Sequence, residues 1–137
     1  MIVDTNVIID VIGAPTTYSP ASATALSRIG LGQRLVVNLV IFAEASARFS
    51  TPEQVEAAFD RLQLNMEPLT NAVAHRAGVA HREYRRAGGA RDTILPDFLI
   101  GAQADMMGLP ILTRDPRRFS TYFRNLVLVD PKGYLDA

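Results

Sequence analysis

The feature that most constrains this chain is a series of short, wholly apolar segments separated by stretches long enough to form helices. Four of these segments are too apolar and β-branched to be surface turns: residues 1–3, residues 35–37, and the LPIL and LVLV segments late in the chain. Each therefore predicts a short buried strand. Strands that are apolar on both faces are typical of parallel sheets covered by helices. The alternation predicts an α/β fold around a mostly parallel sheet of four or five strands, in one domain spanning residues 1–137.

Capping residues indicate where the helices between these strands begin and end. Pro52 and Pro96 stand where a proline fits the first helical turn, and Gly108 stands where a left-handed residue ends a helix. Residues 7–12 fit either a helix or an extended segment. The predicted helices cover residues 22–31, 39–49, 52–63, 70–87 and 96–108, and residues 66–69 predict a further short strand.

Composition and charge exclude several classes of function. The 14 basic and 14 acidic side chains cancel, so no overall field attracts a polyanion or a membrane. The absence of cysteine excludes disulfides, thiolate metal sites and a cysteine nucleophile. We see neither a signal peptide nor an apolar run long enough to span a membrane, and we expect a cytoplasmic protein. Affinity for nucleic acid would have to come from a local patch or from bound cations.

Four carboxylates interrupt otherwise apolar segments: Asp4, Glu44, Asp97 and Asp115. Asp4 and Asp115 each follow a predicted strand, where ligand sites lie in open α/β sheets. Asp97 falls in the first turn of its helix, where the free N–H groups favour an acid. Taken singly, each has an ordinary reading as a turn former, a cap or a solvated side chain. Together they predict a cluster.

Such a cluster needs a cation, because packed anions raise one another's pKa and are costly to ionise. A set of oxygen ligands selects Mg²⁺ or Mn²⁺ over zinc. A metal held in this way suits phosphodiester hydrolysis, since it activates water and stabilises the departing oxygen. This chemistry requires no serine or histidine nucleophile, and the sequence offers few candidates for one.

The segments MIVDTNVIID, FAE, LPDFLIGAQADMMGLPILTRDPRRF and LVLVDP resemble those of PIN-domain ribonucleases and, more narrowly, of the VapC toxins of toxin–antitoxin modules. The late motif, D-x-L-I-x-A-x-A followed by T-x-D-x-x-x-F, is specific, and the resemblance spans nearly the whole chain. The chief departure is Gly101, where the family often has alanine, and one small residue in place of another leaves the resemblance intact. The resemblance implies a PIN-like three-layer α/β/α fold.

It also implies a toxin that acts as a Mg²⁺- or Mn²⁺-dependent endoribonuclease on RNA. Its partner would be a VapB-type antitoxin, and it would form a homodimer or a higher toxin–antitoxin assembly. The catalytic and metal-binding acids of the family map onto Asp4, Glu44, Asp97 and Asp115, with Asp4 and Asp97 as the expected direct ligands. Asn6 and Thr113 match positions that support the acids or the bound water.

Arginines supply candidate contacts to the RNA. Arg114, Arg117 and Arg118 flank Asp115, and the segment 75–91 is rich in arginine, including Arg85 and Arg86. These side chains predict either a phosphate-binding surface or an ordinary solvated helix face. The sequence does not choose between the two.

Three alternatives were weighed against the nuclease. A haloacid-dehalogenase-type phosphatase needs a second aspartate two residues after the first, where this chain has Asn6. A response-regulator receiver needs a lysine near the end of its last strand, whereas Lys132 follows Pro131. A catalytically degenerate PIN-like module that binds RNA or protein stays open if Glu44 points away from the other acids.

Overall fold

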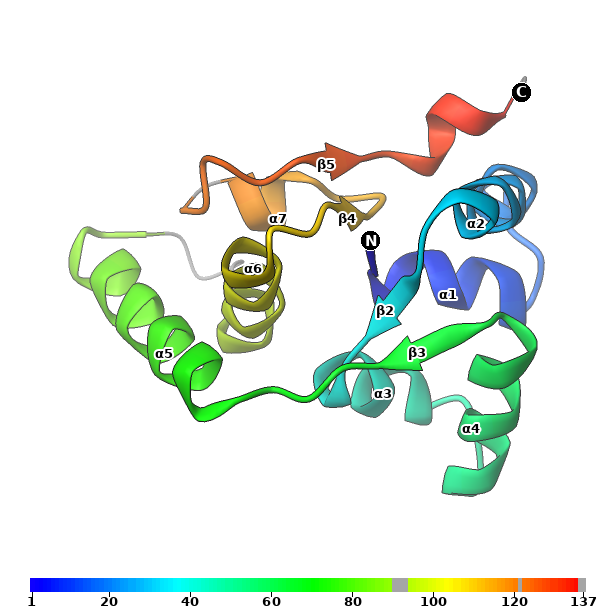
Figure 1. Ribbon diagram of the computed structural model, residues 1–137, viewed down its shortest axis with the longest axis horizontal. Helices are drawn as coiled ribbons and strands as arrows, with labels where there is room; N and C mark the ends of the chain where they lie inside the picture. The colour runs from blue at the N-terminus through cyan, green and yellow to red at the C-terminus, as the bar shows by residue number, and fades with distance from the viewer. Residues whose placement is uncertain (90–93, 121, 136–137) are drawn as a thin grey trace.

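The computed structural model describes residues 1–89, 94–120 and 122–135, and within them five strands form one parallel sheet (Figure 1). The strand order is β3-β2-β1-β4-β5, and every pair of neighbours is parallel. This confirms the predicted fold class. The strands are β1 (Ile2–Val3), β2 (Leu35–Val37), β3 (Leu64–Met66), β4 (Ile111–Leu112) and β5 (Leu128–Val129).

Helices connect these strands and flank the sheet. The connections from β1 to β2 and from β2 to β3 run one way across the sheet, and the connection from β3 to β4 runs back. Right-handed crossovers then place the two groups of helices on opposite faces, which gives three layers. The helices are α1 (Thr5–Ile12), α2 (Ser19–Gly32), α3 (Leu39–Ser46), α4 (Pro52–Arg61), α5 (Asn71–Arg86), α6 (Leu95–Met107), α7 (Arg117–Ser120) and the 3₁₀ turn η1 (Pro131–Tyr134).

Several boundaries differ from the sequence predictions for local reasons. The strand predicted at residues 66–69 lies at Leu64–Met66, because the backbone after Met66 turns toward α5. The ambiguous segment after the first strand is helical from Thr5, since Asp4 is its N-cap and accepts a hydrogen bond from Thr5 N. α2 begins at Ser19, earlier than predicted, with a proline in its first turn. The short α7 and η1 were not predicted.

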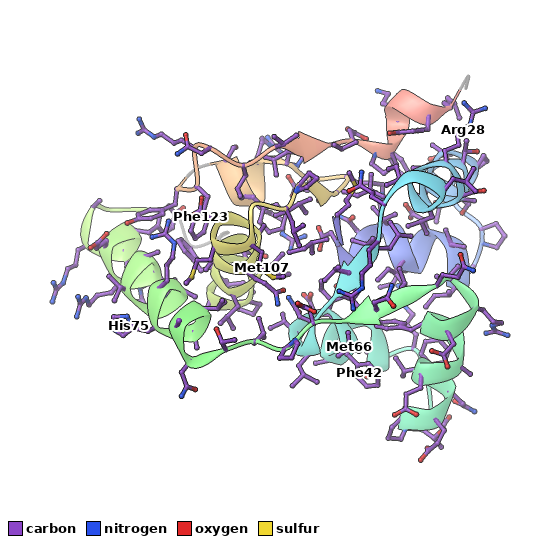
Figure 2. All side chains as sticks on the ribbon, viewed as in Figure 1. Arg28, Phe42, Met66, His75, Met107 and Phe123 are labelled. Carbon is purple, nitrogen blue, oxygen red and sulfur yellow. The ribbon has the colours of Figure 1, made fainter. Side chains whose placement is uncertain are left out.

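The core lies against the central strands. Ile2, Val3, Ile111 and Leu112 have no exposed surface, so β1 and β4 form a rigid platform. A second apolar cluster joins α5 and α6, which lie side by side (Figure 1). Within it Phe123 packs close to α6, and Figure 2 shows this ring beside that helix.

The strand order creates a switch point between β1 and β4. The chain leaves β1 toward β2 on one side and leaves β4 toward β5 on the other. Ligands in open α/β sheets bind outside the carboxyl ends of the strands at such a point. In the described parts of the chain, none of the helices combines the length and apolar character needed to cross a membrane.

Candidate functional site

Asp4 and Asp97 are held at the switch point by groups that orient both of their carboxylates. Asp4 directly follows β1 and has no exposed surface. Its Oδ1 accepts from Thr5 N at 2.8 Å, and its Oδ2 accepts from Thr113 Oγ1 at 2.7 Å. Asp97 is buried in the first turn of α6, where its Oδ2 accepts from Ile94 N at 3.1 Å. Both carboxylates are therefore fixed before any ligand binds.

Arg118 connects these two buried acids. Its Nη1 donates to Asp4 Oδ2 at 2.9 Å and its Nε donates to Asp97 Oδ1 at 2.9 Å. Nη2 makes a further contact to the same Asp97 oxygen. The side chain comes from the single-turn helix α7, and 23% of it is exposed, whereas the Asp4 side chain is fully covered. The guanidinium thus lies on the solvent side of the acids.

Glu44 belongs to the same electrostatic group, although its residue is exposed on α3. Its Oε1 accepts from Thr5 Oγ1 at 2.8 Å, so Thr5 contacts Asp4 through its backbone and Glu44 through its hydroxyl. Partial burial raises the pKa of Glu44, and the charges of Asp4 and Asp97 raise it further against the opposing effects of Thr5 and Arg118. The acid faces the other two rather than away from them.

The pKa values of Asp4 and Arg118 are also shifted by burial and by the charges around them. Burial raises the pKa of Asp4 above its usual value. The Arg118 charge and the hydrogen bonds from Thr113 and Thr5 lower this pKa, but their effect is smaller than that of burial. Burial alone would lower the pKa of Arg118, but the attraction of Asp4, Asp97 and Glu44 outweighs it and raises that pKa. When all are ionised, three carboxylates face one guanidinium. In that fully ionised state, this group of described residues has two more negative than positive charges.

The structure places Asp115, Asn6 and Thr113 on or beside the loop after β4. Asp115 is half-buried, and Arg117 Nε lies 3.8 Å from its Oδ1. Thr113 Oγ1 accepts from Asp115 N at 3.0 Å while it donates to Asp4. Asn6 Oδ1 accepts from Arg114 N at 3.2 Å. Asn6 and Thr113 therefore support the site through backbone and carboxylate contacts.

Arg114 has a role that sequence reasoning missed. Its Nε lies 2.7 Å from Oδ2 of the buried Asp10, and its guanidinium lies 4.2 Å from the centre of the Tyr18 ring. Asp10 Oδ2 also accepts from Ser22 Oγ at 2.7 Å. This cluster ties the loop after β4 to α1 and α2. The available signal was Asp10 inside the apolar run IIDVI, the same signal that pointed to Glu44.

The other predicted RNA contacts are distributed over two places. Arg117 is exposed on α7, and Arg85 and Arg86 are exposed in the last turn of α5. Within the same predicted segment, Arg76 pairs with Asp105 of α6. Arg91 lies outside the described residues. The arginines of α5 therefore form a helix surface separate from the acids at the switch point.

The donor set of the site fits a divalent metal ion in its chemistry. Asp4, Glu44 and Asp97 offer only oxygen atoms, which suits Mg²⁺ or Mn²⁺. As arranged, no group of three acidic or histidine side chains within the described residues is close enough to hold an ion. Arg118 occupies the space between Asp4 and Asp97.

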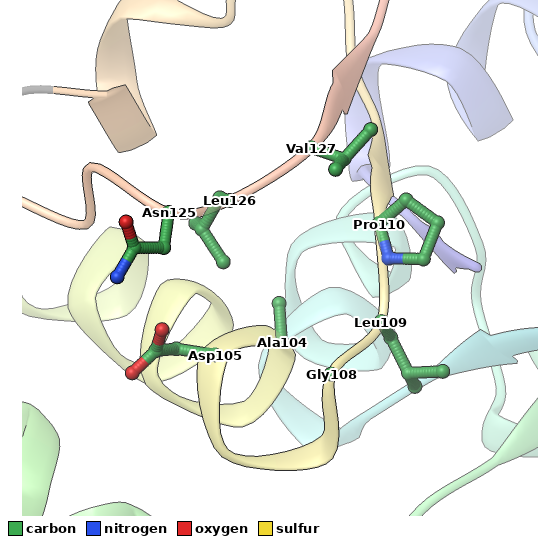
Figure 3. Close-up of a pocket in the computed structure, with 8 residues that line it drawn as sticks. All are labelled: Ala104, Asp105, Gly108, Leu109, Pro110, Asn125, Leu126 and Val127. Atoms are coloured by element: carbon green, nitrogen blue, oxygen red, sulfur yellow. The ribbon is translucent and has the colours of Figure 1, made fainter.

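A pocket at the other end of the sheet has a different character (Figure 3). Gly108 and Pro110, which precede β4, line it together with Leu126 and Val127, which precede β5. It therefore opens near the amino ends of these strands, where ligand sites of open α/β sheets do not lie. We assign it no function.

Comparisons with known proteins agree with this fold. The family model described as PIN domain matches residues 1–123. A chain of VapBC2 from Rickettsia felis, solved with a fragment of promoter DNA, superimposes with a TM-score of 0.71 at 16% identity, covering 94% of this chain and 96% of that one. VapBC-1 from nontypeable Haemophilus influenzae gives 0.71 at 18% identity over 96% and 97%. FitAcB from Neisseria gonorrhoeae gives 0.67 at 19% identity over 96% and 97%.

The comparison with curated proteins found no match. The structural similarities, at such low identities, show a shared fold. The family model covers nearly all of the elements that position Asp4, Glu44 and Asp97. With the acids at the switch point of a five-stranded parallel sheet, this match shows that the chain belongs to the PIN domain family.

Proposed function

We propose that this protein is a Mg²⁺- or Mn²⁺-dependent endoribonuclease and the toxin of a toxin–antitoxin module. The observation that carries the proposal is the bridging of two buried carboxylates, Asp4 and Asp97, by Arg118 at the switch point, with Glu44 joined to Asp4 through Thr5. A purely structural ion pair would balance its charges, whereas this group has an excess of two negative charges when its three carboxylates are ionised. That excess matches the charge of one divalent ion.

Each acidic side chain would have its own role in the reaction. Asp4 and Asp97 would hold the ion, because they are buried and their orientation is fixed by Thr113, Thr5 and the first turn of α6. When bound, the ion would polarise a phosphate oxygen and lower the pKa of bound water. Glu44, oriented by Thr5 Oγ1, would take up the proton of the attacking water on its free carboxylate oxygen. Asp115 would complete the quartet from the loop after β4.

The toxin role and its partners are proposals from similarity. The structural neighbours include VapBC structures from three organisms, and this chain covers at least 96% of the two VapBC chains compared above. We infer a VapB-type antitoxin as partner and a homodimer as the basic assembly. We also infer action in the cytoplasm, where cellular RNA is available as substrate.

The test is cleavage of total cellular RNA by the protein freed of any antitoxin, with Mg²⁺, Mn²⁺ or EDTA. Discrete cuts should require the metal and should be lost in Asp97→Asn. Asp105→Asn is the matched control, because Asp105 lies on the same helix but pairs with Arg76. Circular dichroism should show that both variants are folded. Full cleavage by Asp97→Asn would refute the mechanism.

A second function is favoured by one observation. Arg118 already bridges Asp4 and Asp97, as a permanent ion-pair network would in a module that binds RNA or protein without cutting it. Such a module would bind no Mn²⁺ in calorimetry and would leave RNA intact with every metal. Metal-dependent cutting would exclude it.

A further inference from the structure

Arg118 uses the oxygen atoms that a metal ion would need. It donates to Asp4 Oδ2 and to Asp97 Oδ1, one oxygen on each of the two expected ligands. The other oxygens of these carboxylates accept from the backbone N–H groups of Thr5 and Ile94. Arg118 and a bound metal ion would therefore compete for the same two carboxylate oxygens. A guanidinium and a divalent ion packed side by side would also repel each other.

We propose that Arg118 is a built-in counter-cation that closes the acidic site in the absence of metal, and that a divalent ion binds by displacing it. This inference rests on the proposed metal centre and adds its regulation. Metal affinity is then set by a competition within the chain. The protein would bind metal only at a free ion concentration high enough to displace Arg118 from Asp4 and Asp97.

The position of Arg118 would let its side chain move away from Asp4 and Asp97. It stands on the four-residue helix α7, so few backbone hydrogen bonds hold its position. Part of its side chain is exposed, while Asp4 and Asp97 beneath it are almost wholly covered. A rotation of the side chain toward solvent would uncover both acids without moving β1 or α6.

The neighbouring residue supplies a matched control. Arg117 precedes Arg118 on the same turn, but 93% of its side chain is exposed and it lies near Asp115 at 3.8 Å. Removing its charge changes the field at Asp115, while Arg118 stays paired with Asp4 and Asp97. Exposed charges of this kind contribute little.

The first experiment measures Mn²⁺ binding by titration calorimetry in the wild type, Arg118→Met and Arg117→Met. Arg118→Met should bind Mn²⁺ at least about tenfold more tightly than the wild type, because each charge-assisted hydrogen bond that the ion must break is among the stronger interactions in proteins. Arg117→Met should stay within about threefold. Equal affinity in the wild type and Arg118→Met would overturn the inference.

The second experiment does not depend on the folding of Arg118→Met. In ¹⁵N-labelled wild type with EDTA, the Arg118 Nε–H resonance should be visible and slow to exchange, because it is bound to Asp97. Its assignment comes from its absence in Arg118→Lys. Titration with diamagnetic Mg²⁺ should move it to the position of an exposed arginine. A resonance that stays unchanged at saturating Mg²⁺ would overturn the inference.

These outcomes separate the inference from the proposed function. Metal-dependent RNA cleavage with equal Mn²⁺ affinities would leave the nuclease intact and remove only the competition. Failure of both the wild type and Arg118→Met to bind Mn²⁺ would overturn the metal centre, and this inference with it.

Discussion

Replacing Gly101 with alanine should destabilise the protein, although alanine is the better helix former. Gly101 lies inside α6, and a Cβ added there would stand 2.6 Å from both Cδ2 and Cε2 of Phe123. That ring is 5% exposed and packs against Phe98 and Tyr122. It cannot move aside without disturbing the whole cluster.

The magnitude follows from two opposing effects. An alanine in a helix interior is favoured over glycine by about 1 kcal/mol, while an extra methyl in a packed core costs about 1–3 kcal/mol. The matched control is Gly78→Ala in α5, where a Cβ meets nothing within 4 Å. The control should gain about 1 kcal/mol. Gly101→Ala should therefore be less stable than Gly78→Ala by about 1–3 kcal/mol.

Thermal and urea unfolding, followed by circular dichroism in EDTA, measures this difference directly. For a chain of this size, about 1 kcal/mol corresponds to a shift of roughly 3–5 °C in Tm. The penalty at Gly101 should shrink when Phe123 is replaced by leucine in the same chain. If Gly101→Ala is as stable as Gly78→Ala, the packing of Phe123 on α6 is wrong.

Two further predictions concern the acids and the buried polar groups. Glu44→Gln keeps an oxygen atom that accepts from the Thr5 hydroxyl, but it removes the carboxylate. Burial and the neighbouring acids raise the pKa of that carboxylate, which means that its charged form is unfavourable in the folded protein. In EDTA the variant should therefore be more stable than the wild type at neutral pH, with the difference shrinking as pH falls through the raised pKa toward 4.5; a constant difference in unfolding free energy across this range would contradict it. Gln103→Leu removes the partner of Asn38 Nδ2 at 2.8 Å and of Pro68 O at 3.2 Å, in a fully buried position. It should cost about 1–3 kcal/mol in urea unfolding, and an unchanged midpoint would show that the network carries no stability.

The sequence by itself determined most of the strands and longer helices and the places of Asp4 and Asp97 along them. Strands could be predicted because residues such as Ile2 and Val36 are apolar and β-branched in short runs. Helix ends could be predicted because a cap such as Thr51, which accepts from Gln54 N, acts within one turn. Asp4 and Asp97 were located by the same local logic, one after a strand and the other in a first helical turn.

Only the tertiary structure decided which cation faces those acids. Arg114, Arg117 and Arg118 lie within five positions of one another, yet they pair with Asp10, Asp115 and the Asp4–Asp97 pair respectively. The direction in which each side chain leaves its loop depends on packing against α1, α2 and α6, which local sequence does not encode. Arg118 and Asp4 are 114 residues apart. Their contact exists because the parallel pairing of β1 with β4 brings the carboxyl ends of both strands to one edge of the sheet.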